Sequence, residues 1–438
     1  MKCFKVSVLF VVLALSFCSI AQDKNKVLSV KDMHADIDYY YSNLQQIHPN
    51  PYLVLSEQEF QNKIDSLKHL IDKPLTKQEF FLHISSFNKY TDLHTNIRGS
   101  KKMLKQNANV TYSFPRFDMQ GGVVTFYDKD SMICSLVAVN DVSTHQIEDY
   151  FFSCKNLVEL SEDYNFYDML TLYIANHFCS DTLNFSYTTQ GKNIQTMKIA
   201  PNKAKDDVKG KRTFHLSVDS LQSIAVFEIN SFLPKKVKDY IAYTKYVDNV
   251  FDTLKQKNIN RLYLDLTCNN GGLIAFEEHL LSYLVTDETR KVLWDLVVKQ
   301  SAKRRSQRGP VPLVADGNYH QQRQYFTARD VKNKFKGEVF VIQSRKSFSA
   351  ASTLASQLQT YRKSTIIGEE CQIKAVYTDP ILLTLPKSKF MFMCATGFIK
   401  NVGENKTKGV VPDIEYKIYN PYEEISIEQA EMMRQIKN

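Results

Sequence analysis

The sequence predicts an α/β protein in which a helical N-terminal region and a small, mostly β region precede a larger α/β region. Three observations predict this fold class. Apolar residues recur at helical spacing from Asp36 to about Asn88. Short strand-like runs replace that spacing between Val110 and about Ala200. From residue 212 onward, strand and helix patterns alternate.

Residues 1 to 21 are typical of a secretory signal peptide. Lys2 and Lys5 precede an apolar stretch from Val6 to about Phe17, and Ser19-Ile20-Ala21 offers a cleavage site after Ala21. The apolar stretch is too short to span a bilayer. Phe17 stands where a lipoprotein signal needs Gly or Ala, so lipid anchoring is not expected. We therefore expect an exported protein of the periplasm or cell envelope, without stable membrane insertion.

The helical N-terminal region is expected to cover residues 22 to 105. Three series of apolar residues recur at helical spacing: Ile37, Tyr41 and Leu44; Phe60, Ile64, Leu67 and Ile71; and Phe80, Ile84 and Phe87. The third helix opens with Thr76-Lys77-Gln78-Glu79, a capping box in which side chains satisfy exposed N–H groups.

Residues 106 to 205 are expected to form the mostly β domain. Val123–Tyr127 and Leu136–Val139 are typical of strands, and a helical pattern covers Gln146–Phe152. The stretch from Leu136 to Phe152 is similar to the strand-turn-helix part of a PDZ-like module, but it has no Gly-Leu-Gly-Phe-type carboxylate-binding loop. The Lys-rich segment 202 to 212 is expected to be a linker.

The α/β region is expected to span residues 212 to 420, with 421 to 438 as a C-terminal tail. The expected helices of this region are Lys235–Gln256 and Ala275–Val285. Its expected strands are Ile224–Ile229, Arg261–Leu266, Glu338–Gln343, Thr365–Ile367, Ile381–Leu385 and Phe390–Cys394.

Two segments of this region contain candidate catalytic groups. The strand ending at Leu266 leads into Asn269-Asn270-Gly271-Gly272, a turn whose backbone N–H groups can point at a ligand. Ser349 comes directly before a helical pattern, which places its hydroxyl where the helix dipole favours developing negative charge. A nucleophile and an oxyanion-binding turn are therefore expected.

These segments resemble the tail-specific, or C-terminal-processing, serine protease family. The family has an LDLRxNxGG-like turn, a serine in a (T/S)xSAxE-like context, a strand ending in Gly-Glu and a closing GVxPD motif. Here Leu264–Gly272, Ser347–Ala351, Ile366–Glu370 and Gly409–Asp413 match them in order. The resemblance implies a crotonase-like (ClpP/crotonase) spiral fold for residues 220 to 420.

Two upstream motifs narrow the resemblance to one branch of the family. His48-Pro49-Asn50-Pro51-Tyr52 and Asp92-Leu93-His94-Thr95 look like the branch related to the tricorn protease core and interphotoreceptor retinoid-binding repeats. The second motif resembles the DGHT motif that supplies the histidine in that branch.

The base that would activate Ser349 is left open between two residues. His94 is one candidate, because a neutral imidazole is already near its working pKa. Lys374 is the other, since it lies at the offset from the serine used by the Ser-Lys branch, and its apolar neighbours favour the neutral amine. The N-terminal motifs favour His94, whereas Cys371–Lys374 departs from the Thr-Gly-Gly of the tricorn-like branch.

The resemblance implies roles for further residues. Glu404 is a candidate for the acidic residue that orients the site, and the N–H groups of Gly271, Gly272 and Ala350 are the expected oxyanion donors. Asp265 and Asn269 are expected to hold the turn.

Composition limits the other function classes. The net charge of +9 falls to +7 once the two lysines of the signal are removed, and no basic stripe interleaved with aromatics favours nucleic-acid binding. The scattered histidines and the cysteine spacings suggest no metal site, so no cofactor is expected. The oligomeric state cannot be predicted.

The sequence predicts an exported serine endopeptidase acting on unfolded or flexible polypeptides of the cell envelope, through Ser349 with His94 or Lys374 as base. The alternative is a catalytically inactive relative that binds a peptide or hydrophobic ligand. Four departures from the family pattern keep it open: Leu93 for Gly, Ser352 for Glu, Thr267-Cys268 for Arg-Asn, and the missing Thr-Gly-Gly.

Overall fold

A computed structural model describes most of the chain between residues 23 and 436. The positions it leaves undescribed within that span are 24, 108–109, 129–130, 155–164, 178–180, 190–192, 204–208, 210–211, 234–236, 286–290, 310–313, 372–376 and 401–408. The predicted signal peptide therefore lies outside the described residues. Among the helices that are described, none combines the length and the apolar composition needed to cross a membrane.

The α/β region is built on a six-stranded sheet with the order β12-β13-β14-β17-β18-β23. Its strands are β12 (Phe214–Asp219), β13 (Ile224–Ile229), β14 (Arg261–Asp265), β17 (Glu338–Gln343), β18 (Thr365–Gly368) and β23 (Ile414–Glu415). All pairs are parallel except β12 with β13. Because parallel strands share one direction, the turns after β14 and β17 meet at the same edge of the sheet.

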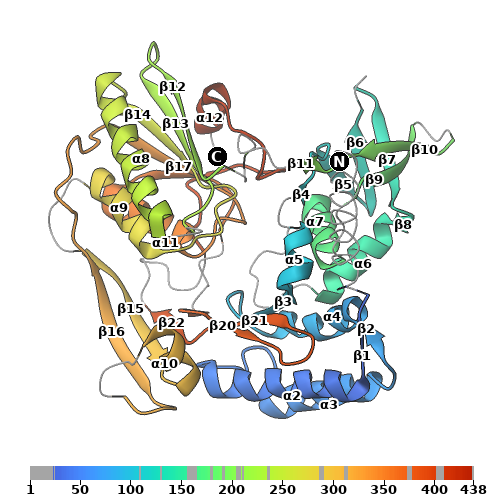
Figure 1. Ribbon diagram of the computed structural model, residues 1–438. Coiled ribbons are helices and arrows are strands. Elements are labelled where there is room, and N and C mark those ends of the chain that lie inside the picture. The colour runs from blue at the N-terminus through green and yellow to red at the C-terminus, as the bar shows by residue number, and fades with distance from the viewer. Residues whose placement is uncertain are drawn as a thin grey trace, which may run out of the picture.

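Helices cover both faces of this sheet (Figure 1). The helices are α8 (Val237–Gln256), α9 (Ile274–Leu284) and α11 (Ala350–Gln357) on one face and α12 (Ile427–Arg434) on the other. Alternate residues of β13 point to opposite cores: Ala225 and Phe227 pack with α8, α9 and α11, whereas Ile224 and Val226 pack with α12. Burial on both faces explains the continuous apolar runs in the sequence.

The N-terminal region is helical, as the periodicity predicts. Its elements are β1 (Val27–Leu28), α2 (Val30–Ile47), α3 (Glu57–Leu70), β2 (Leu75–Thr76), α4 (Lys77–Ser85) and the 3₁₀ helix η1 (Ser86–Tyr90). The capping box at Thr76 and Glu79 is confirmed, with both reciprocal hydrogen bonds present.

A segment from late in the chain completes the N-terminal core. The strands β3 (Asn96–Ser100), β20 (Ile381–Thr384) and β21 (Phe390–Cys394) form one antiparallel sheet in which β21 is central. Phe390 and Phe392 pack against Phe80, Phe81 and Tyr40 of the helices. This part of the predicted 212 to 420 region therefore shares a core with the N-terminal helices (Figure 1).

The middle region is an antiparallel sheet with two helices, α6 (Thr144–Cys154) and α7 (Phe166–Asn176), packed on one face. Its strands are β5 (Phe117–Gln120), β6 (Val123–Tyr127), β7 (Ile133–Val139), β8 (Val142–Ser143), β9 (Leu183–Thr189) and β10 (Gln195–Ile199). The predicted strand and helix patterns are confirmed as β6, β7 and α6. Three short elements flank this region: α5 (Lys101–Asn107), which packs on the N-terminal core, and the paired strands β4 (Val110–Thr111) and β11 (Asn202–Lys203).

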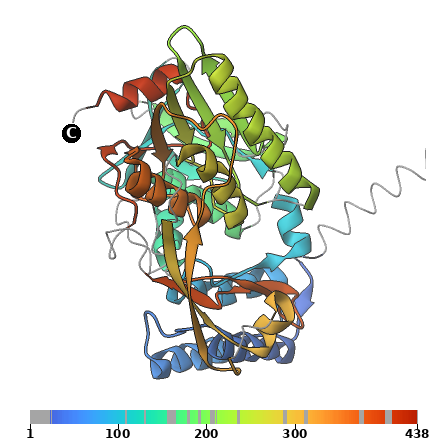
Figure 2. The same ribbon diagram turned by 90° about the vertical axis from the view of Figure 1, so that its left-hand side faces the viewer.

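A long hairpin links the α/β region to the N-terminal helices. It consists of β15 (Lys291–Lys299) and β16 (Tyr319–Phe326), and it is joined by β22 (Gly397–Lys400), β19 (Tyr377–Thr378) and the helix α10 (Ala302–Arg308). Figure 2 shows the hairpin running from the upper region down to α2 and α3. The Nζ atom of Lys299 donates hydrogen bonds to the carbonyls of Gln45 and His48, at 3.1 and 3.0 Å, where α2 ends.

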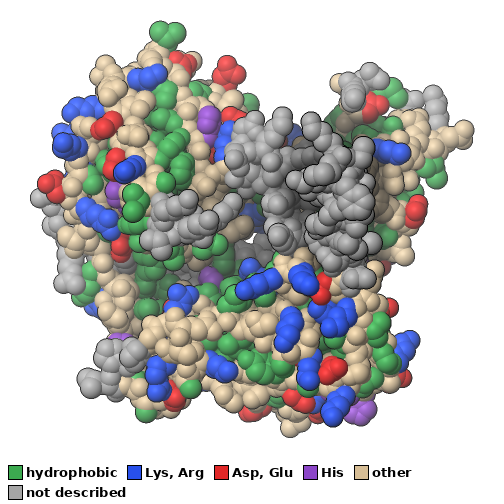
Figure 3. All heavy atoms as spheres, in the orientation of Figure 1, with side chains coloured by type: hydrophobic (Ala, Val, Ile, Leu, Met, Phe, Trp, Pro, Cys, Tyr) green, Lys and Arg blue, Asp and Glu red, His purple; other side chains and the backbone are tan. Residues whose placement is uncertain are grey.

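The visible face of the molecule carries both signs of charge. In Figure 3, Lys and Arg side chains are interspersed with Asp and Glu, and a group of basic side chains lies over the N-terminal helical region. Cys134, Cys154, Cys268, Cys371 and Cys394 are free thiols, and Cys179 lies outside the described residues.

Candidate active site

Ser349 lies in a strained turn between β17 and α11. Its φ of 55° and ψ of −124° are sparsely populated for a residue with a side chain, so the surrounding contacts must hold it there. The Ser347 hydroxyl donates to the carbonyl of Leu266 at 2.8 Å, and the Phe348 N–H donates to the carbonyl of Asn269 at 3.0 Å. These contacts fix the serine turn against the turn that follows β14. The Ser349 side chain is partly exposed at the start of the helix.

The two glycines of the neighbouring turn are needed for close approach. A Cβ on Gly271 would lie 2.5 Å from the Phe348 carbonyl oxygen and 2.7 Å from the Cβ of Ser349. A Cβ on Gly272 would lie 2.2 Å from the carbonyl of Phe232. Both residues also have positive φ, at 82° and 146°. The Asn-Gly-Gly turn therefore packs directly on the nucleophile segment.

One of the three expected oxyanion donors is already engaged. The Gly271 N–H donates to Asn269 Oδ1 at 2.8 Å, so its role as an oxyanion donor stays a prediction. The backbone of Phe232 forms hydrogen bonds with both neighbours of Gly272. Its carbonyl accepts from the Leu273 N–H, and its own N–H donates to the Gly271 carbonyl. The Ala350 N–H is the first of its helix and has no acceptor within the helix. The amides of Gly272 and Ala350 remain the candidate pair.

A buried hydrogen-bond network stabilises the turn that follows β14. The Nζ atom of Lys209 donates to Asp265 Oδ2 at 2.6 Å, to Thr267 Oγ1 at 2.9 Å and to the Glu423 carbonyl at 2.8 Å. Asn269 donates from its amide to the Ile229 carbonyl at 3.0 Å. Asp265 and Asn269 hold the turn, as expected, whereas the part played by Lys209 was missed because its segment looks like a linker.

His94 lies opposite the serine. Its Nε2 is 3.2 Å from Ser349 Oγ, although the two residues are 255 positions apart in the sequence. His94 comes from the loop between η1 and β3, so the N-terminal region supplies it. Its ring packs on that of Phe348 with 4.6 Å between the centroids. A hydroxyl and an imidazole thus meet at hydrogen-bonding distance beside the candidate donors.

The environment keeps His94 neutral. Burial lowers the pKa of its imidazole below the ordinary 6.5, while the charge of Asp92 and the Tyr377 carbonyl act in the opposite direction. Among the described residues, His94 Nδ1 has no hydrogen bond of normal geometry. A neutral imidazole at neutral pH can accept a proton.

Asp92 and His48 form a second buried pair behind His94. Asp92 Oδ1 accepts the backbone N–H of His94 at 2.7 Å, and Asp92 Oδ2 lies 2.8 Å from His48 Nε2. Both side chains are about 1% exposed. The motifs around these residues stood out in the sequence, but nothing in their local pattern indicated that they would meet.

Two further candidates, Lys374 and Glu404, lie outside the described residues. Their predicted roles stay predictions. Within the part of the chain that is described, no cluster of three or more His, Cys, Asp and Glu side chains is arranged to hold a metal ion.

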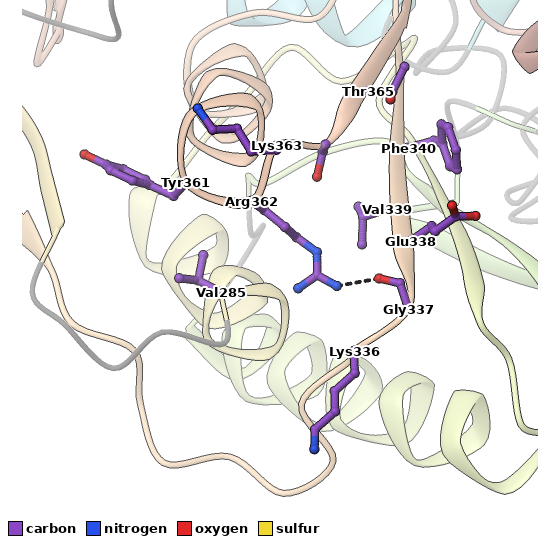
Figure 4. A pocket seen from close by; sticks show the side chains of 11 residues that line it. Val285, Lys336, Gly337, Glu338, Val339, Phe340, Tyr361, Arg362, Lys363 and Thr365 are labelled. Atoms are coloured by element: carbon purple, nitrogen blue, oxygen red, sulfur yellow. Dashed lines mark hydrogen bonds between the residues drawn. The ribbon is translucent and has the colours of Figure 1, made fainter.

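A pocket of about 580 Å³ at the other end of the sheet is distinct from this site (Figure 4). It opens where β17 and β18 begin, whereas Ser349 follows the end of β17. Its central cation, Arg362, donates to the carbonyls of Leu284, Phe335 and Gly337. Because this guanidinium holds backbone carbonyls, we assign it a structural role.

The comparisons with known proteins agree with a serine nucleophile on an α/β scaffold. The model of peptidase family S41 matches residues 223–416. A tail-specific protease of Haemophilus influenzae is 26% identical over 218 residues, which cover 48% of this chain and 27% of that protein. The chain thus spans about a quarter of the length of this curated relative.

Solved structures show that the fold is shared more widely. The structure of mature CPAF covers 88% of this chain and 92% of its own, at 11% identity and a TM-score of 0.56. Mature CPAF complexed with lactacystin gives 11% identity and a TM-score of 0.57, with 88% and 94% covered. At this level of identity the likeness concerns the fold alone.

Proposed function

We propose that this protein is an exported serine endopeptidase that cleaves unfolded or flexible polypeptides in the cell envelope. The contact between Ser349 Oγ and His94 Nε2 at 3.2 Å carries the proposal. A serine hydroxyl becomes nucleophilic when a neighbouring base takes its proton, and the geometry supports His94 as that base. The match to peptidase family S41 supports a peptide bond as the target.

The reaction follows from the placement of the groups. His94 Nε2 accepts the proton of Ser349 while Oγ attacks the carbonyl carbon, and the N–H groups of Gly272 and Ala350 stabilise the resulting oxyanion. His94 then returns the proton to the leaving amine as the carbon–nitrogen bond breaks. Water attacks the acyl group on Ser349, with His94 again taking a proton and finally restoring the serine hydroxyl.

The substrate class is inferred from the site and the relatives. Ser349 is partly exposed in a turn, so an extended segment can reach it more readily than a folded domain. The relative named as a tail-specific protease supports a polypeptide substrate. The signal-like residues 1 to 21 support export.

We propose a role in the reaction for Glu404 and for Lys374. Glu404 is the acidic residue we expect to orient His94 through Nδ1, which has no normal hydrogen bond to another described residue. Lys374 is the alternative base. If Lys374→Met abolishes cleavage while His94→Ala leaves it unchanged, Lys374 rather than His94 is the base that activates Ser349.

A cleavage assay with the mature protein tests the proposal. We expect denatured casein to be degraded, and Ser349→Ala and His94→Ala to reduce the rate by at least about 100-fold. A serine-directed fluorophosphonate should label the wild type but not Ser349→Ala. Peptide binding without turnover or labelling would contradict the proposal and favour the inactive binding relative.

A further inference from the structure

The buried pair of His48 and Asp92 is not used in the reaction described above, yet it contacts the base segment directly. Asp92 accepts the backbone N–H of His94 with one carboxylate oxygen and faces His48 Nε2 with the other, at 2.7 and 2.8 Å. Both side chains are about 1% exposed, so neither is accessible to a substrate. Any effect on catalysis must therefore act through His94.

We propose that Asp92 is a positioning residue that holds His94 and offsets the positive charge of its protonated ring, and that His48 keeps the Asp92 carboxylate ionised and in place. This inference rests on the proposed function, in which His94 passes through an imidazolium. It assigns a role to the His-Pro-Asn-Pro-Tyr motif that begins at His48.

The hydrogen bonds fix the tautomer of His48. The backbone N–H of Asn50 lies 3.1 Å from His48 Nδ1, and an N–H group can only donate. Nδ1 is therefore an acceptor, and in the neutral ring the proton sits on Nε2, where it is donated to Asp92. The ring of His48 also packs on that of Tyr377, at 4.8 Å between centroids. His48 is thus held from two sides in the orientation that serves Asp92.

The charge of Asp92 favours protonation of His94. Burial by itself would raise the pKa of Asp92, but the hydrogen bond and the electrostatic attraction from His48, followed by the hydrogen bond from Thr95, bring it below the ordinary value. The carboxylate therefore stays ionised although it is buried. Its charge opposes the lowering of the His94 pKa by burial.

The other polar groups around the pair do not take over this role. Arg98, on β3, lowers the pKa of His94 and so acts against an imidazolium. Tyr40, Tyr377 and Cys394 also face Asp92, and burial raises the pKa of each. These three groups are neutral at neutral pH. Asp92 is therefore the acidic side chain that acts on His94 within the described residues.

The test compares variants that keep or remove the donor to Asp92. His48→Gln places an amide N–H near the position of Nε2, His48→Asn does not, and Asp92→Asn removes the charge. We expect Asp92→Asn to lower kcat/KM by about 100-fold and His48→Asn by about tenfold, with little change in KM. His48→Gln should stay within about threefold of the wild type.

The pH profile separates positioning from mere stability. Losing the charge of Asp92 lowers the pKa of His94, so the acid limb of kcat/KM should move to lower pH in Asp92→Asn and His48→Asn. The matched control is Asp248→Asn, which breaks the His279–Asp248 pair, 2.9 Å long, between α8 and α9. That variant should leave the acid limb in place. Reduced rates with an unmoved acid limb, or a His48→Gln variant as slow as His48→Asn, would overturn the proposal.

A titration of the His94 ring by NMR in the Ser349→Ala background keeps this test independent of turnover. A lower imidazole pKa in Asp92→Asn supports the inference, and an unchanged pKa refutes it. If the wild type cleaves no substrate, the proposed function fails, whereas the titration still decides the role of Asp92. Should Asp92→Asn not fold, the two His48 variants provide the same comparison.

Discussion

At Ser349 the backbone conformation and the chemistry are linked. A positive φ in a non-glycine residue is costly by about 1–3 kcal/mol, and it persists here because the serine turn is bonded to the turn after β14. This conformation directs the Ser349 hydroxyl from a sharp strand-to-helix turn toward His94. Gly271 is the residue that lets the two turns approach.

Gly271→Ala tests this contact. The added methyl would lie within 2.8 Å of Phe348, Ser349 and Ala350, so the serine turn must shift. We expect fluorophosphonate labelling of Ser349 to slow by about 100-fold, with a stability loss of about 1–3 kcal/mol measured by urea unfolding.

The matched control is Gly121→Ala, which also has positive φ but no neighbour within 4 Å of the added methyl. It should cost stability without slowing the labelling. Equal labelling rates in both variants would show that the approach of Gly271 does not position Ser349.

At the scale of elements, the packing of α9 against α11 buries the acidic side chain of Glu277, which has no cationic partner among the residues that the structure describes. Glu277 is about 1% exposed, and its Oε2 accepts the Thr353 hydroxyl at 2.9 Å. Burial raises the pKa of this carboxyl well above the ordinary 4.5. The group is therefore protonated in the folded protein under conditions where the unfolded chain ionises it.

Glu277→Gln should change how stability depends on pH. Above pH 4.5 the unfolded chain releases this proton and the folded protein retains it, so the contribution of Glu277 falls as pH rises, by up to about 1.4 kcal/mol per unit. The amide keeps an acceptor for Thr353 and cannot ionise.

Urea unfolding at pH 5, 6, 7 and 8 should show the variant gaining stability relative to the wild type as pH rises. Glu428→Gln, an exposed position on α12, serves as the control with no such trend. Parallel curves for the wild type and Glu277→Gln would show that Glu277 is not protonated in the folded protein.

The elements that the sequence predicts well are those whose burial is regular. The apolar runs of β13 and β17 are buried on both faces, and their bounds agree with the expected strands. In contrast, β16 consists of Tyr-His-Gln-Gln-Arg-Gln-Tyr-Phe and is largely exposed, so it has no apolar pattern to detect. Its partner β15 gives it a strand conformation through tertiary pairing.

Single motifs also indicated Ser349 and His94, but not what surrounds them. The engagement of the Gly271 N–H by Asn269 depends on a side-chain rotamer, and the meeting of Asp92 with His48 depends on how α2 packs. Neither leaves a signal in local sequence.

At the scale of the molecule, nucleophile and base belong to different hydrophobic cores. Ser349 precedes α11 in the core of the α/β region, whereas His94 precedes β3 in the core shared by the N-terminal helices and β21. Lys299 on the connecting hairpin joins the two by donating to the end of α2. The geometry of the site therefore depends on docking contacts away from it.

Lys299→Met should loosen this docking while keeping most of the side-chain volume. Two carbonyls lose a charged donor, which we expect to cost about 2 kcal/mol in urea unfolding and about tenfold in kcat. Lys303→Met, an exposed change on α10, is the control and should match the wild type. A Lys299→Met variant with full activity would show that docking does not depend on this contact.

The pairing of β3 with β21 has a consequence for biogenesis. The hydrophobic core beneath His94 includes Phe390 and Phe392, so the first hundred residues cannot finish packing until the chain is available as far as β21, which ends at Cys394. In the exported enzyme that we propose, a chain caught partway through secretion would hold the imidazole of His94 on an incompletely packed scaffold. The proposed proteolytic activity would thus be absent until most of the chain has been translocated.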